Sequence, residues 1–112
     1  MRPGREAPTA SQGKYLQAIC RLSEGGERPV LQRDVVRWLG CSKPSVSRAA
    51  ALLRQRGWLE PDRRDLALTP EGREWALRLC RVRRRLEMLG VPETAAAPAA
   101  VLLALGGTES QE

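Results

Sequence analysis

The stretch from Leu39 to Gly57, LGCSKPSVSRAAALLRQRG, restricts the fold of this chain more than any other segment. Gly40 readily takes the left-handed conformation that ends a helix, and Ser42 has the side chain of a helix N-cap. Pro44 falls in the first turn, where its missing N–H costs nothing. The stretch therefore predicts one helix that ends at Gly40 and a second that ends at Gly57, which together form a helix-turn-helix.

The second helix of this pair has two different faces. Val46, Ala50 and Leu53 recur at helical spacing and predict a buried side. The helix opens with small or polar residues, which let a backbone approach the major groove of DNA, and Arg48 has the fork that bridges guanine O6 and N7. The predicted DNA-facing residues are Ser42, Lys43, Pro44, Ser45, Ser47 and Arg48.

Shorter elements precede this pair. Residues 1–10 predict a disordered arm, because they combine charge with proline and glycine. A helix is expected from Ser11, its predicted N-cap, to the Glu24-Gly25-Gly26 stop. An edge strand is expected at 29–31. The helix at 32–39 turns Arg33 and Arg37 outward.

The segments after Gly57 predict a wing and two helices. Residues 58–60 and 66–68 flank a turn that holds Arg63 and Arg64, which is typical of a β-hairpin. Thr69 and Pro70 begin a helix that ends at Gly90, and a last helix is expected at 93–105. Apolar residues recur along the first of these helices at coiled-coil spacing and predict a dimer interface, with two leucines of the last helix added: Trp75, Leu79, Val82, Leu86, Leu89, Leu102 and Leu105.

The expected fold is therefore mostly α with a small β-wing. With 112 residues, the chain is the size of one domain. We expect an arm at 1–10, a winged helix-turn-helix at 11–70, a helical dimerisation region at 71–106 and a tail at 107–112.

The formal net charge is +6 and the basic residues are almost all arginine, which favours a nucleic-acid partner. The alternative is a small α/β domain in which the arginines form a solvated face. Under the first interpretation, the phosphate contacts are expected from Arg33, Arg37, Arg54, Arg56, Arg63 and Arg64.

Catalysis is not expected. The chain has no histidine, and it lacks both a glycine-rich phosphate loop and a nucleophile with a partner base. Cys20, Cys41 and Cys80 lie far apart without CxxC spacing, which argues against a disulfide framework and a zinc site. Cys20 and Cys80 are expected in the core or an interface, while Cys41 leaves a redox-sensing role open. No segment has the length of a membrane span, so a soluble, cytoplasmic protein is expected.

Three tracts together resemble the diphtheria-toxin-repressor and manganese-transport-regulator family of iron- and manganese-dependent repressors. They are GKYLQAICRL, QRDVVRWLGCSKPSVSRAAALLRQRGWLE and LALTPEGREWA. The resemblance implies a dimeric winged-helix repressor of the short form, without an SH3-like domain. It implies that Ser42, Pro44, Ser45 and Ser47 open the DNA-reading helix, that the equivalent of Arg48 faces bases, and that the last two helices dimerise.

The resemblance also implies a metal site, but the residues at its ligand positions do not suit one. A divalent first-row metal needs anionic or imidazole ligands. Here the ligand positions of the family hold Lys14, Gln17, Arg83, Ala100, Leu103 and Ala104. No cofactor is therefore expected, and manganese or iron enters only by analogy with the family.

Several functional hypotheses remain open from the sequence. The first is a homodimeric regulator that binds double-stranded DNA without metal, either fixed in its DNA-competent form or governed by another signal. The second is a repressor that answers manganese or iron through other ligands. The third is a winged-helix protein-interaction module without DNA specificity.

Overall fold

The computed structural model describes residues 7–24 and 26–90, and within them the chain is mostly helical, as predicted. The helices are α1 (Ala10–Leu22), α2 (Gln32–Leu39), α3 (Lys43–Gln55) and α4 (Pro70–Met88). The helix predicted at 93–105, the tail, most of the predicted arm, and the interface residues Leu102 and Leu105 lie outside the described residues.

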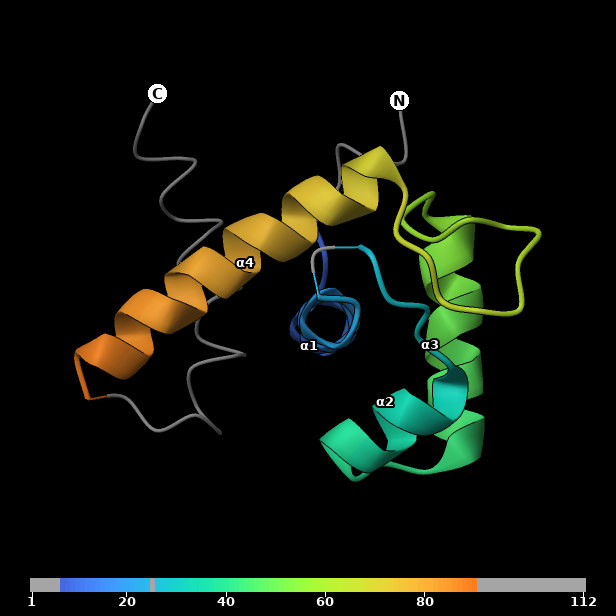
Figure 1. The fold of residues 1–112 in the computed structure, drawn as a ribbon, viewed down its shortest axis with the longest axis horizontal. Coiled ribbons are helices and arrows are strands. Elements are labelled where there is room, and N and C mark those ends of the chain that lie inside the picture. The colour runs from blue at the N-terminus through green and yellow to red at the C-terminus, as the bar shows by residue number, and fades with distance from the viewer. Residues whose placement is uncertain (1–6, 25, 91–112) are drawn as a thin grey trace.

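Helix α1 forms the centre of the fold. It packs against α2, α3 and α4, and α2 packs against α3. Figure 1 shows α1 end-on, with α4 crossing above it, α3 on one side and α2 below. Leu16 and Ile19 of α1 are buried in one cluster with Trp58. Phenylalanine is absent, and Trp58, Tyr15 and aliphatic side chains fill the core.

The helix ends follow local capping chemistry. Ser42 caps α3 and Thr69 caps α4, as predicted, and Pro follows within the first two positions of both helices. The predicted N-cap of α1 is wrong, because Thr9 and not Ser11 occupies that position. The Thr9 side chain accepts from the Gln12 N–H at 3.1 Å, and the Gln12 side chain accepts from the Thr9 N–H at 3.0 Å. This reciprocal pair fixes the start of the helix one turn before Gly13.

The predicted strands at 29–31, 58–60 and 66–68 are not formed in the part of the chain that the structure describes. Pairing is reduced to a single antiparallel bridge between Leu59 and Leu68 and to isolated backbone bonds. The Glu60 N–H donates to Ala67 at 2.9 Å, and the Leu66 N–H donates to Val30 at 2.7 Å. We call residues 58–68 the 58–68 loop. Buried Val30, Leu59 and Leu66, and not a hydrogen-bonded ladder, hold these segments together.

Among the described residues, no helix has the length and hydrophobicity that a transmembrane segment requires.

Candidate functional site

The junction of α2 and α3 is a tight turn of three residues. Gly40 has φ +67° and ψ +31°, and its N–H donates to Val36 at 2.9 Å, which closes α2. A side chain at Gly40 would be strained in this conformation. The Tyr15 hydroxyl donates to Cys41 Sγ at 3.8 Å, so α1 contacts the turn directly. Burial and this contact raise the pKa of Tyr15.

Helix α3 presents its predicted polar residues to the surface. Val46, Ala50 and Leu53 are buried against the core. Ser45 is half-buried and takes part in the cap, because its N–H and its Oγ both contact Ser42 Oγ. The other residues predicted to face DNA from this helix are exposed: Ser42, Lys43, Pro44, Ser47 and Arg48.

The two predicted phosphate contacts of α2, Arg33 and Arg37, are also exposed. Trp38 lies beside them with 47% of its surface exposed. The Arg21 guanidinium lies over its ring, 5.0 Å from the centroid. This cation–π contact joins α1 to the outer face of α2.

Arg54 at the end of α3 is turned toward the 58–68 loop. Its Nε donates to the Glu60 carbonyl at 3.3 Å and its Nη2 to the Arg63 carbonyl at 3.1 Å. These contacts position the loop beside α3. Arg56 also makes internal contacts, because its Nη2 donates to Ala7 and its guanidinium lies 4.5 Å from the Trp58 ring centroid. Their guanidinium groups therefore contribute to the structure of the protein itself.

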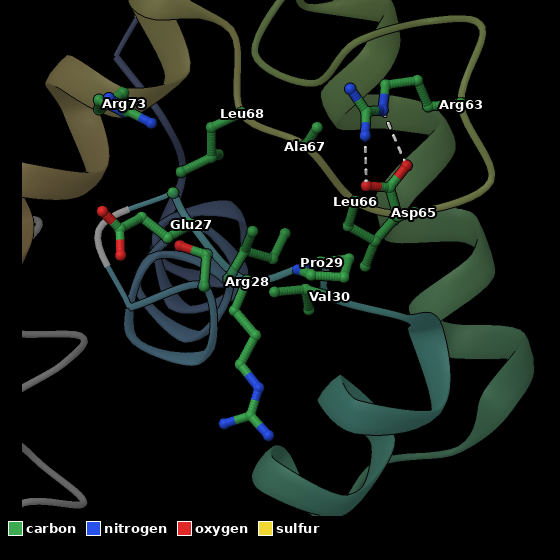
Figure 2. Close-up of a pocket in the computed structure, with 13 residues that line it drawn as sticks. Glu27, Arg28, Pro29, Val30, Arg63, Asp65, Leu66, Ala67, Leu68 and Arg73 are labelled. Carbon is green, nitrogen blue, oxygen red and sulfur yellow. Dashed lines mark hydrogen bonds and ion pairs between the residues drawn. The ribbon is translucent and has the colours of Figure 1, made fainter.

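The two arginines of the 58–68 loop differ in their surroundings. Arg63 forms two hydrogen bonds of 2.8 Å with the carboxylate of Asp65, and both lie at the edge of a pocket of about 280 Å³ (Figure 2). The Arg63 hydrogen bond lowers the pKa of Asp65. Arg64 is exposed. The charge of Arg63 is thus balanced locally, whereas that of Arg64 faces solvent.

The start of α4 is fixed to the base of the 58–68 loop. Thr69 donates through its N–H to Trp58 at 3.0 Å and through its hydroxyl to Gly57 at 2.7 Å. A Cβ on Gly72 would lie 2.1 Å from the Trp58 carbonyl oxygen. Only glycine allows this approach without a shift of backbone.

The residues of α4 that were predicted to form a dimer interface differ in their exposure to solvent. Leu79 is fully buried, while Trp75, Val82 and Leu86 are half-buried. Leu89 has 80% of its surface exposed. Two exposed apolar residues of this helix were not predicted: Leu77 and Met88. The most exposed apolar residues, Met88 and Leu89, therefore lie at the C-terminal end of α4, and Leu79 belongs to the interior.

The positions that the family resemblance assigns to a metal hold a buried cation. Lys14 is exposed, whereas Gln17 and Arg83 are buried. Arg83 Nη1 forms an ion pair of 3.3 Å with Glu87. Within residues 7–24 and 26–90, no three histidine, cysteine, aspartate or glutamate side chains gather. A guanidinium at this place repels a divalent cation, so these residues do not fit the metal. Ala100, Leu103 and Ala104 lie outside the described residues.

The packing of α1 against α4 brings together two cysteines that the sequence separates. In this thiol pair, the Cys80 side chain and burial raise the pKa of Cys20, while the Cys20 side chain, with Arg83 nearby, lowers the pKa of Cys80 to about 6. No spacing in the sequence could indicate this pair, because it depends on the crossing of two helices.

No protein-family model matches this chain, and a search of curated proteins finds no match either.

Proposed function

We propose that this chain is a transcriptional regulator that binds double-stranded DNA through the N-terminal half of α3. The observation that carries the proposal is the exposed edge formed by Ser42, Lys43, Pro44, Ser47 and Arg48. The opposite face of α3 is buried, and Gly40 and Tyr15 fix the turn that precedes it. The edge is thus both exposed and rigidly positioned.

The chemistry of this edge suits the major groove. The backbone N–H groups at the start of a helix attract phosphate, and small side chains there allow close approach. Lys43 adds a positive charge next to that end of α3. Arg48, one turn further along, is long enough to reach a base edge, and guanine offers its fork two acceptors. Phosphate contacts thus give affinity, while Arg48 gives preference for sequence.

The 58–68 loop would act as the wing of a winged helix. It follows α3 directly, and Arg54 holds it beside that helix through two backbone carbonyls. Arg64 is the loop arginine with an exposed charge that is not taken up by Asp65. We infer that Arg64 contacts the DNA backbone next to the major groove that α3 enters.

Dimerisation and independence from metal complete the proposal. Leu77, Met88 and Leu89 leave apolar surface exposed on α4, on which a second copy would pack. A dimer would place two α3 helices on two half-sites of one operator. The buried Arg83 guanidinium, paired with Glu87, has no lone pair with which to ligate a metal at the place where the family would hold one, which favours a regulator that needs none.

The test is selection of bound sequences from a random pool of DNA duplexes, with and without manganese, using the full chain. We expect an enriched motif with two-fold symmetry and the same enrichment in both arms. Enrichment only with manganese would contradict metal independence. Absence of any salt-dependent binding at low ionic strength would contradict DNA binding itself.

The exposed apolar end of α4 also favours a second candidate function. Contiguous exposed apolar surface marks protein–protein contacts. A winged-helix interaction module would use Met88 and Leu89 and would bind no DNA. Substituting both residues with serine discriminates the candidates, because a DNA-binding dimer would lose symmetric operator binding but keep weak binding to one half-site.

A further inference from the structure

We propose that the pocket between α1, the 58–68 loop and the start of α4 binds a small organic monocarboxylate with an apolar body. Binding of this ligand does not depend on DNA binding by α3. Three features of the pocket carry the assignment: an apolar floor, a guanidinium that the local backbone holds at the rim, and a lining with an excess of positive charge.

The floor of the pocket is apolar. Ile19 of α1, Val30 and Leu66 line it, and each of them is almost fully buried. The Leu66 N–H donates to the Val30 carbonyl at 2.7 Å, which joins the two loops at this floor. The pocket volume is about 280 Å³. Since a water molecule takes about 30 Å³ in the liquid, there is room for roughly nine non-hydrogen atoms. A small molecule with a short hydrocarbon chain fits this space.

Arg73 is held at the rim of the pocket by Gly26. The Gly26 N–H donates to the Ser23 carbonyl at 3.1 Å, and its φ of +95° belongs to a tight turn. A Cβ at Gly26 would overlap the Arg73 guanidinium, so glycine allows that group to lie against the turn. Among residues 7–24 and 26–90, no hydrogen bond or ion pair engages the Arg73 side chain. Its planar fork therefore remains open to a carboxylate.

The charges around the pocket add up to a small positive excess. Arg28, Arg63 and Arg73 line it together with Glu27 and Asp65, which gives a formal charge of +1. Figure 2 shows the Arg63–Asp65 pair at one end and Arg73 with Glu27 at the other. The Arg28 side chain extends away from both ends (Figure 2). A single carboxylate on Arg73 would thus neutralise the lining.

The position of Glu27 favours one negative charge over several. It lines the same end of the pocket as Arg73, and no ion pair joins the two within the part of the chain that the structure describes (Figure 2). A multiply charged anion such as phosphate would be repelled by this carboxylate and would gain nothing from the apolar floor. A monocarboxylate places its charge on Arg73 and its chain on Val30 and Leu66.

Such a ligand would also restrain the 58–68 loop, which forms one wall of the pocket. This consequence rests on the proposed function, because the loop is the proposed wing. A wing that is already restrained loses less conformational freedom when it contacts DNA, so the ligand should tighten DNA binding. The carboxylate would then act as an effector of the regulator.

The test is titration of the ¹⁵N-labelled full chain with sodium hexanoate, followed by two-dimensional NMR. We expect saturable shifts of the Gly26 and Leu66 amide signals. Acetate lacks the hydrocarbon chain and hexanamide lacks the charge, so each should bind about tenfold more weakly or worse. These two compounds are matched controls that need no variant.

Three variants test the residues at the rim. Arg73→Gln should weaken hexanoate binding about tenfold, because a hydrogen bond to a charged group is lost. Glu27→Gln should tighten it roughly threefold, because a nearby like charge is removed. Arg84→Gln makes the same change as the first variant at an exposed position of α4 and should bind as the wild type does. Circular dichroism establishes that each variant is folded.

Several outcomes would overturn the site. Equal binding of hexanoate and hexanamide would exclude recognition of charge, and acetate binding as tightly as hexanoate would indicate an adventitious ion only. Unchanged affinity in Arg73→Gln, or shifts confined to the exposed apolar end of α4 at Met88 and Leu89, would place the ligand elsewhere.

A separate measurement tests the effector role. Fluorescence anisotropy with the selected duplex should show DNA affinity at least about twofold higher with saturating hexanoate. Saturable shifts at Gly26 and Leu66 without any change in DNA affinity would overturn the effector role and leave the site in place. If no DNA binds under either condition while those shifts persist, the proposed function fails and the carboxylate site stands.

Discussion

Arg54 and Arg63 are joined by a hydrogen bond of 3.1 Å from the guanidinium of Arg54 to the main-chain carbonyl of Arg63. The same guanidinium donates to the Glu60 carbonyl at 3.3 Å. A planar fork can hold two carbonyl oxygens at fixed positions, which a lysine ammonium cannot do as well. Arg54 therefore fixes the 58–68 loop relative to α3.

Substitution of Arg54 should loosen this loop. We expect Arg54→Ala to lower the free energy of unfolding by about 1–2 kcal/mol, because two hydrogen bonds from a charged donor are lost at a partly exposed site. Urea denaturation measures the change. Hydrogen exchange of the Glu60 amide, which donates to Ala67, should quicken. Arg84→Ala, on an exposed position of α4, is the control and should leave both unchanged.

Substitution of Arg48, in contrast, should weaken DNA binding without changing the stability of the fold. Its side chain is exposed, so Arg48→Ala should leave the urea midpoint unchanged. If it reads a base, the substitution costs about 1–3 kcal/mol of DNA-binding free energy and relaxes preference at one base position. Fluorescence anisotropy with the selected duplex measures the affinity. Equal binding by Arg48→Ala and Arg84→Ala would remove Arg48 from the interface.

The ion pair between Arg63 and Asp65 should influence how DNA affinity depends on salt. Asp65→Asn removes the carboxylate that balances Arg63, so binding to DNA at low salt should tighten. The slope of log affinity against log salt should steepen by up to about one, and Arg64→Ala should flatten it by about one. Arg63→Ala should have the smaller effect of the two arginine substitutions. A larger effect of Arg63→Ala would contradict the local balance.

The helix ends were predictable from the sequence where one residue type, such as a glycine or a capping serine or threonine, determines the end by its own chemistry. Gly40, Ser42 and Thr69 mark helix ends through their own backbone or side-chain chemistry, and the structure places them as expected. The start of α1 was also readable, since Thr9 and Gln12 have the spacing of a capping box, but Ser11 competed with it.

The course of the 58–68 loop was not predictable in the same way. Alternation at 58–60 and 66–68 indicates strands, yet three residues on each side make only one bridge. Tertiary contacts decide the rest: Arg54 and Val30 hold the 58–68 loop from distant positions. Likewise, the local balance of the Arg63 charge depends on its pairing with Asp65, which no residue pattern indicates.

Gly72 should not tolerate a side chain. Alanine is the better helix former, and at an ordinary position it would stabilise α4. Here its Cβ would lie 2.1 Å from the Trp58 oxygen and 2.9 Å from the Trp58 carbonyl carbon. We expect Gly72→Ala to destabilise the chain by about 1–3 kcal/mol through overpacking. Glu74→Ala, exposed on the same helix, is the control in urea denaturation. A stabilised Gly72→Ala would contradict this close approach.

In the reduced protein, titration of Cys20 and Cys80 should give the free energy of unfolding a maximum as the pH is varied. Between pH 6 and the ordinary cysteine pKa of about 8.5, the unfolded chain keeps a proton on Cys80 that the folded chain has lost, so stability rises with pH. Above that range, the unfolded chain loses the Cys20 proton while the folded chain keeps it, so stability falls. Thermal unfolding with a phosphine reductant measures this.

Cysteine variants show how much of the pH dependence of stability comes from Cys20 and Cys80 rather than from other ionisable groups. Cys80→Ser should remove the rise between pH 6 and 8.5, whereas Cys41→Ser should preserve it. An identical pH profile in wild type and Cys80→Ser would show that the pair does not contribute.

In the proposed DNA-binding dimer, the attachment of Thr69 and Gly72 to Gly57 and Trp58 has a consequence for the spacing of half-sites. The end of α3, the base of the 58–68 loop and the first turn of α4 share this one attachment, so they move as a rigid unit. In a dimer formed through α4, the angle between the two α4 helices would then set the distance between the two α3 helices. The apolar surface at Met88 and Leu89 would thereby select the number of base pairs between operator half-sites, without touching DNA.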